Sequence, residues 1–104
     1  MSYQETIANR KSKKPFQYYK TLLLSLYALV HNGLSYREIA DLLNQAKIST
    51  PSGKEWTPIS TQVTVSRLND GNYSGWIVDS RDRLVDQGLL SDDVLAAMAQ
   101  RKRS

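Results

Sequence analysis

The sequence predicts a mostly α-helical protein, built as a single bundle of four to five helices. Apolar residues recur at three- and four-residue steps in several segments, which is the periodicity of helices with one buried face. Helix-start residues precede these segments, and glycines follow most of them. With 104 residues and no cysteine, the chain has the size of one domain and must rely on an apolar core, because disulfides are excluded.

The first helix is expected from Phe16 to Val30. Pro15 precedes it, and proline suits a helix start because the N–H that it lacks would have no partner there. The apolar residues cover a wide face, so we expect this helix at the centre of the core. The residues of that face are Tyr19, Leu22, Leu23, Leu26, Tyr27 and Val30.

A second helix is expected from Ser35 to about Gln45. Asn32 and Gly33 can supply the left-handed residue that ends the first helix. Ser35 and Glu38 have the spacing of a capping box, in which the serine oxygen accepts an early backbone N–H and the glutamate accepts the N–H of the serine. One apolar stripe follows, made of Tyr36, Ile39, Ala40 and Leu43.

The segment from Lys47 to Thr57 is expected to form a short hairpin or an ordered loop between the second and third helices. Pro51, Ser52 and Gly53 are turn residues, and they separate two short pieces with an extended pattern.

The stretch 59–70 gives conflicting local signals. Its alternation of apolar and polar residues, with many β-branched side chains, is typical of a strand. Thr57 and Pro58 before it and Gly71 after it favour a helix instead, so the two assignments are even on local grounds. A helix would bring together Ile59, Val63 and Ser66, with Val65 and Leu68 next to that face.

Two further helices are expected over residues 79–87 and 92–101, with Gly88 between them. Acidic residues in the first turn of the last helix suit the positive end of the helix dipole. The loop before these helices is expected to carry Tyr73, Trp76 and Ile77.

Charge is distributed unevenly along the chain. Residues 1–67 hold nine Lys or Arg and four Asp or Glu, whereas residues 68–100 hold two basic and six acidic residues. We expect residues 1–14 to form a flexible basic arm, followed by a single helical domain over residues 15–104. The net charge of +4 favours an anionic partner. The longest apolar run is too short to span a membrane, so we expect a cytoplasmic protein without a membrane partner.

Residues for catalysis or metal binding do not form a convincing set. Asp79, Asp82 and Asp86 share one helical face, but arginines interleave them and such faces are usually solvated. His31 is the only histidine, so no triad or multi-histidine metal centre can be assembled. The glycines are isolated and form no phosphate-binding loop. We therefore expect no enzymatic activity, no cofactor, no metal and no small-molecule ligand.

A helix over residues 59–70 would display neutral hydrogen-bonding side chains and one guanidinium. Such groups suit the base edges of DNA in the major groove, where Gln pairs with adenine and Arg with guanine. A polar helix surface that faces water explains the same composition equally well. The residues expected to contact bases are Ser60, Thr61, Gln62, Thr64 and Arg67.

Two motifs carry a resemblance to a known family. Residues 33–44 read Gly-x-Ser-x-Arg-x-Ile-Ala-x-x-Leu-Asn, and residues 50–56 read Thr-Pro-x-Gly-x-x-Trp. Together with Leu68, Tyr73 and Gly75, they resemble the DNA-binding "recombinase" domain of large serine recombinases. The resemblance covers roughly residues 20–76. Asp70 stands where that family usually has asparagine.

The resemblance implies a helix-turn-helix-type module that follows a catalytic resolvase domain in full-length family members. It favours a helix over residues 59–70. Only about 20 residues precede the matching segment, so we expect no recombinase activity from this chain. The residues that we expect in the core are Tyr36, Ile39, Leu43, Trp56, Leu68 and Tyr73.

We therefore predict a non-catalytic, sequence-specific protein that binds double-stranded DNA, acting as a transcriptional regulator or a recombination accessory factor of a bacterial mobile element. A helix at about 57–70 would enter the major groove. The alternative is a module that binds another protein through its acidic C-terminal helices, residues 79–101, which are also the candidate homodimer surface. The residues expected to contact phosphates are Arg10, Lys11, Lys13, Lys14, Lys20, Arg37, Lys47 and Lys54.

Overall fold

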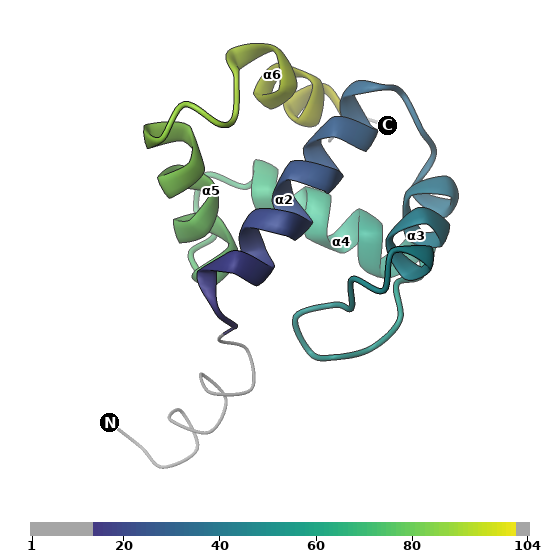
Figure 1. The fold of residues 1–104 in the computed structure, drawn as a ribbon. Coiled ribbons are helices and arrows are strands. Elements are labelled where there is room, and N and C mark those ends of the chain that lie inside the picture. Colours follow the sequence, from purple (N-terminus) through teal and green to yellow (C-terminus); the bar gives the residue numbers. More distant parts are fainter. Residues whose placement is uncertain (1–13, 102–104) are drawn as a thin grey trace.

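The computed structural model describes residues 14–101 and contains no strand within that range. Helices account for most of it, which confirms the mostly α prediction (Figure 1). In chain order they are α2 (Phe16–His31), α3 (Tyr36–Gln45), α4 (Pro58–Asn69), α5 (Trp76–Asp86) and α6 (Asp92–Arg101).

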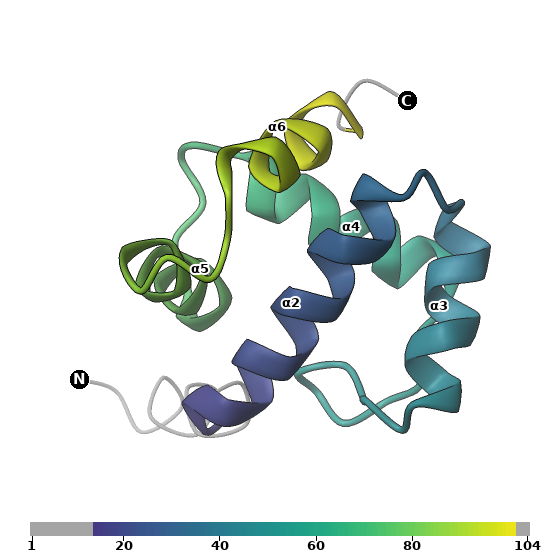
Figure 2. The same cartoon turned by 45° about the horizontal axis from the view of Figure 1, so that its top comes forward.

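Helix α2 is the central element of the fold. It contacts α3, α5 and α6, and both views show it running through the middle of the bundle (Figures 1 and 2). The wide apolar face predicted from the sequence is buried against these neighbours, because no single partner could cover it. Its buried residues are Tyr19, Leu22, Leu23, Leu26, Tyr27 and Val30.

The remaining helices form two groups around α2, with α3 and α4 in one group and α5 and α6 in the other. Helix α3 lies on one side of α2 and α5 lies on the other (Figures 1 and 2). Helix α4 packs against α3 and also contacts α6. Helix α4 therefore links the two groups, and its orientation depends on both.

Helix α3 begins with the capping box that the sequence predicted. The Ser35 oxygen accepts the backbone N–H of Glu38 at 3.1 Å, and the backbone N–H of Ser35 donates to the Glu38 carboxylate at 2.9 Å. These hydrogen bonds lower the pKa of Glu38 because they favour its charged form. Ile39, Ala40 and Leu43 are buried, as their spacing predicted.

The connection from α3 to α4 is an ordered loop and contains no strand pair, so the loop is the correct one of the two predicted forms. Backbone N–H of Thr50 donates to the Lys54 carbonyl at 2.8 Å, and the Thr50 hydroxyl oxygen accepts the Lys54 N–H at 3.0 Å. Gly53 has a φ of 84°, a left-handed conformation that glycine adopts without steric cost.

Helix α4 settles the conflict over residues 59–70 in favour of a helix. Thr57 is its N-cap and accepts the Ser60 N–H at 3.1 Å, with Pro58 in the first turn. These end signals prevail over β-branched propensity because the helix also buries Val65 and Leu68 in the core. Asp70 follows the helix and accepts the Asn72 N–H at 2.9 Å, a contact that an asparagine oxygen would also make.

The buried face of α4 differs from the expected one. The sequence pattern grouped Ile59 with Val63, but these two are exposed, and the buried residues are Thr61, Val65 and Leu68. Thr61 can lie in the core because its hydroxyl donates to the Thr57 carbonyl at 2.8 Å and leaves no unpaired polar group. The helix is therefore rotated relative to the prediction, with aliphatic side chains on its outer surface.

Helix α5 begins at Trp76, three residues before the predicted start at Asp79. The loop assignment for Trp76 and Ile77 was therefore wrong. Ile77, Ser80 and Leu84 are buried at helical spacing, and this packing decides the start of the helix against the turn-like composition before it.

The C-terminal helices are tied to the end of α4 by side-chain hydrogen bonds. The Asn69 amide donates to the Met98 carbonyl in α6 at 2.6 Å. From α5, the Arg81 guanidinium donates to the Leu68 carbonyl at 2.5 Å. Free carbonyls at the end of a helix need such partners, so Arg81 of α5 satisfies a carbonyl of α4 and Asn69 of α4 satisfies a carbonyl of α6. None of the described helices is long and apolar enough to cross a membrane.

Candidate nucleic-acid interface

The outward surface of α4 is the centre of the candidate site. Its exposed residues include Ile59, Gln62, Val63, Ser66 and Arg67. Helix α3 covers the opposite side of α4, where Thr61, Val65 and Leu68 are buried in the core. The fold therefore holds α4 by one face and leaves the other open.

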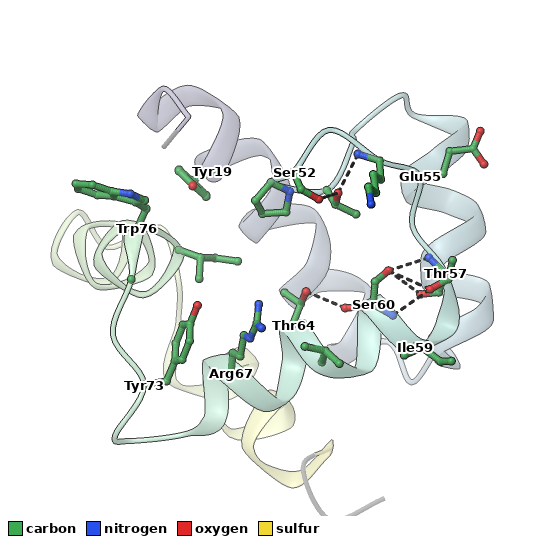
Figure 3. A pocket seen from close by; sticks show the side chains of 16 residues that line it. Tyr19, Ser52, Glu55, Thr57, Ile59, Ser60, Thr64, Arg67, Tyr73 and Trp76 are labelled. Atoms are coloured by element: carbon green, nitrogen blue, oxygen red, sulfur yellow. Dashed lines mark hydrogen bonds between the residues drawn. The ribbon is translucent and has the colours of Figure 1, made fainter. Parts of the chain in front are cut away.

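A groove with a volume of about 670 Å³ lies along this surface (Figure 3). One wall is α4 itself, and the α3–α4 loop closes the end near Thr57. The opposite wall comes from the start of α2, through Tyr19, and from residues 73–77. Segments that are far apart in the sequence thus form one concave surface.

Hydrogen bonds fix the loop against α3 and α2. The Asn44 side chain contacts the backbone of Trp56 twice, because its amide donates to the Trp56 carbonyl at 2.9 Å and its oxygen accepts the Trp56 N–H at 2.7 Å. The buried Trp56 indole donates to the Ile48 carbonyl at 2.8 Å. The Tyr18 hydroxyl donates to the Ser49 carbonyl at 2.5 Å. The loop therefore holds a defined position beside α4.

Three of the residues expected to contact bases line the groove together: Ser60, Thr64 and Arg67. Gln62 is exposed and lies outside the groove, beside a second and shallower depression along α4. Thr61 is fully buried, which contradicts a base contact by this residue. The reason is the rotation of α4, which turns Thr61 toward the core.

The hydroxyl groups of Ser60 and Thr64 already have backbone partners. Thr64 donates to the Ser60 carbonyl at 2.8 Å, and Ser60 donates to the Thr57 carbonyl at 3.1 Å. The Ser60 oxygen also accepts the Thr57 backbone N–H at 2.9 Å and the Thr57 hydroxyl at 3.3 Å, so both of its lone pairs are used. The Thr64 oxygen keeps acceptor capacity for a ligand.

Arg67 is placed for an external partner. Its guanidinium lies over the ring of Tyr73, with 5.5 Å from the guanidinium carbon to the ring centroid. Among the described residues, the structure gives Arg67 neither an ion pair nor a hydrogen bond from its side chain. Stacking restricts its motion and leaves its N–H groups available, which suits bidentate recognition.

The residues expected to contact phosphates are spread more widely. Lys54 lines the groove. Arg37 is exposed in the first turn of α3, and Lys47 is exposed just after α3, whereas Lys20 on α2 is half-buried. Lys14 is half-buried at the start of the described range, and Arg10, Lys11 and Lys13 lie outside it.

Several groove residues were not foreseen from the sequence. Ile59 and Val63 were grouped as an apolar face, and Tyr73 was expected in the core, where it packs only in part. Glu55 and Trp76 also line the groove. The N-cap at Thr57 and the spacing of Thr61, Val65 and Leu68 were the signals that could have indicated the rotation of α4. The stripe was missed because its first residue is a threonine.

The described residues contain no cluster of three or more potential metal ligands. Asp79, Asp82 and Asp86 do not form such a group, and Asp82 instead pairs with Arg81 at 3.0 Å. Tyr19 faces the groove as a neutral group, since burial raises the pKa of its hydroxyl. The groove thus offers hydrogen-bonding, aliphatic and cationic groups.

Comparison with known families decides the relationship of this chain. The family model described as Recombinase matches residues 19–102. This chain belongs to the Recombinase family. The match includes α5 and α6, so the Recombinase domain extends beyond the residues 20–76 that carried the resemblance in the sequence. No curated protein and no solved structure matches the chain. Membership of the Recombinase family connects the chain with DNA recombination.

Proposed function

We propose that this Recombinase-family chain is a non-catalytic, sequence-specific protein that binds double-stranded DNA, with α4 as its recognition helix. The observation that carries the proposal is the open face of α4, which presents Gln62, Ser66 and a stacked Arg67 without ion pairs among the described residues. Helices that read DNA insert such a face into the major groove, about 12 Å wide.

The elements that hold α4 in place, α3 and the α3–α4 loop, fit the role of α4 as a recognition helix. Helix α3 packs across α4, as the first helix of a helix-turn-helix unit does, although a longer loop joins the two here. That loop is fixed by Asn44 and Trp56 and carries Lys54 at the edge of the groove. Lys54 would contact a phosphate while α4 contacts bases.

Two acidic residues define how far the DNA would extend. Asp70 ends α4 and is exposed, so it disfavours a phosphate near the C-terminal end of the helix. Glu55 lies at the groove edge beside Lys54 and suits the amino group of a cytosine better than a phosphate. The phosphate contacts would therefore lie toward the N-terminal end of α4, where Lys54 lines the groove.

The biological role that follows is that of a transcriptional regulator or a recombination accessory factor. Family membership links the chain with recombination, and the hydrogen bonds of the Ser52, Ser60 and Thr64 hydroxyl groups in the groove run to other hydroxyls or to the backbone, not to a basic side chain. Binding without catalysis is the function that these residues support.

A salt titration of DNA binding tests the proposal. If about five phosphates are neutralised, log K should fall against log salt with a slope of about −4 to −5. A mobility shift with random-sequence DNA at low and at moderate salt measures this, and selection of bound sequences from a random pool then gives the target. Lys13 and Lys14 replaced together by Ala should weaken binding to every sequence alike. A salt-insensitive complex would contradict the proposal.

The second candidate function is binding of another protein through α5 and α6. Its support is the pair Val85 and Leu89, which leave 37 % and 46 % of their surfaces exposed near the end of α5, within an acidic region. Absence of DNA binding at low salt, together with capture of a basic protein partner that is lost in Val85→Ser, would favour this function over the first.

A further inference from the structure

Two aliphatic side chains on the outer face of α4 make little contact with the rest of the fold. Ile59 leaves 73 % of its surface exposed, and Val63 leaves 40 %. Both line the groove, and Ile59 lies in the first turn of α4 near Ser60 (Figure 3). A ligand that covers them gains hydrophobic free energy, so their environment should indicate which ligand fits.

The polar and positively charged residues around Ile59 and Val63 favour a ligand that carries a small apolar group among polar and anionic groups. Ser60 and Thr64 lie on the same side of α4, and Arg67 and Lys54 against Glu55 leave the groove with a net positive charge. Lysine is instead depleted in the core of a protein–protein interface. In the major groove of DNA, the C5 methyl group of thymine lies among hydrogen-bonding base edges and between phosphates.

A second copy of this chain fits the face less well. A two-fold dimer places the same patch of each subunit against the other. Such a contact through α4 would bring Lys54 and Arg67 of the two copies into one interface, and like charges repel across an apolar contact. DNA supplies the opposite charge, so the charge complementarity of the groove favours it.

We propose that Ile59 and Val63 read thymine, each by packing against a C5 methyl group in the major groove. The inference rests on the proposed DNA-binding function and adds the identity of the bases. The two residues are four positions apart, which is about 6 Å along a helix. Base pairs are about 3.4 Å apart, so the two thymines lie within about two base pairs of each other. Arg67, one turn further, would contact a neighbouring guanine.

Replacement of thymine by deoxyuridine tests this directly, because it removes only the methyl group. The target selected from a random pool is synthesised with uracil at one thymine at a time, and the dissociation constant is measured for each duplex. Wild-type protein should lose about fourfold in affinity for each methyl group that it contacts. Ile59→Ala and Val63→Ala should each lose the preference for thymine over uracil at one position of the target, the one whose methyl group the replaced side chain contacts.

A matched control separates contact from general weakening. Leu89→Ala removes an exposed aliphatic side chain that does not line the groove, and it should keep the full preference for thymine. Because Ile59 is largely exposed, Ile59→Ala should melt at the wild-type temperature, which confirms that the variant is folded.

The outcomes distinguish this inference from the function on which it rests. Specific DNA binding with no loss on any uracil replacement, or an equal loss in wild type and in both α4 variants, overturns the thymine-reading pair and leaves DNA binding in place. Dimerisation that Ile59→Ala abolishes, with thymine preference unchanged, also overturns it in favour of a second copy. Absence of binding to any duplex overturns the proposed function itself.

Discussion

Two arginines in neighbouring parts of the molecule show how the two sides of the fold differ. Arg81 in α5 donates to the Leu68 carbonyl and pairs with Asp82, and only 22 % of its side chain is exposed. Arg67 in α4 is exposed and stacks on Tyr73, without an ion pair among the described residues. The first guanidinium holds α4 in place, whereas the second is available to a ligand.

The same difference applies to the surfaces around them. The surface of α5 and α6 that faces α4 uses its polar groups for internal contacts, for example the hydrogen bonds from Asn69 to the Met98 carbonyl and from Arg81 to the Leu68 carbonyl. The groove beside α4 leaves aliphatic groups and cations open to solvent. If α4 binds DNA as proposed, positioning and recognition are carried by separate residues, and variants should affect them separately.

The largest expected effect comes from a cavity created in the part of the core beside α5. Leu84 is fully buried in α5, and Leu84→Ala should lower the free energy of unfolding by about 2–5 kcal/mol, because it removes apolar contact and leaves a cavity. Chemical denaturation followed by circular dichroism measures the loss.

The neighbouring Val85→Ala is the matched control, because Val85 is 37 % exposed and should cost little. Unfolding of α5 and α6 alone, with α3 and α4 retained in hydrogen exchange, would show that the two groups of helices are independent. That result would contradict the joint core described here.

An intermediate effect comes from the two arginines compared above. Arg81→Ala should lower the free energy of unfolding by about 1–3 kcal/mol, because it leaves the Leu68 carbonyl without its partner. Arg67→Ala should leave stability within about 0.5 kcal/mol of wild type and remove about 1–3 kcal/mol of discrimination between target and altered bases. Thermal unfolding and competition binding measure the two quantities.

Replacement of Arg67 by lysine separates the effect of its charge from the effect of its planar shape. Arg67→Lys keeps the charge but loses the planar fork, so it should bind random DNA normally and lose sequence preference. If Arg81→Ala changed sequence preference as strongly as Arg67→Ala, the division between positioning and recognition would be incorrect.

The smallest effects are expected at the two capping boxes. Thr57→Ala should cost about 1 kcal/mol at any pH, because neither Thr57 nor Ser60 titrates. Glu38→Gln should destabilise α3 at pH 7 but not at a pH below the lowered pKa of Glu38. The pKa of Glu38 is lowered in the folded protein, so its contribution is complete above the usual carboxyl range and disappears as the pH falls through the lowered value. Urea unfolding at the two pH values checks this, and an equal cost at both would contradict it.

Much of the fold could be predicted from the sequence because its signals are local. The limits of α3 follow from Ser35 and Glu38, and the extent of α2 follows from a regular apolar pattern. Local signals failed where neighbouring elements decide. Trp76 and Ile77 look like loop residues until Ile77 packs in the core with Leu84.

The candidate site was predicted in part for the same reason. Ser60, Thr64 and Arg67 were identified by residue type, and they do lie on one groove. Thr61 has the same chemistry but points inward, and no property of an isolated threonine distinguishes the two cases. Tyr73 was recognised as a packing residue, but its place beneath Arg67 depends on how the chain returns after α4.

The positions of four helices, the capping residues of α3 and α4 and the resemblance to the Recombinase family could all be read from the sequence. Capping hydrogen bonds and helical periodicity act within a few residues, so they can be read along the chain. The rotation of α4 depends on tertiary packing, because α3 and α6 both contact this helix. That packing buries Thr61 and leaves Ile59, Val63 and Arg67 on the surface, where a ligand could contact them.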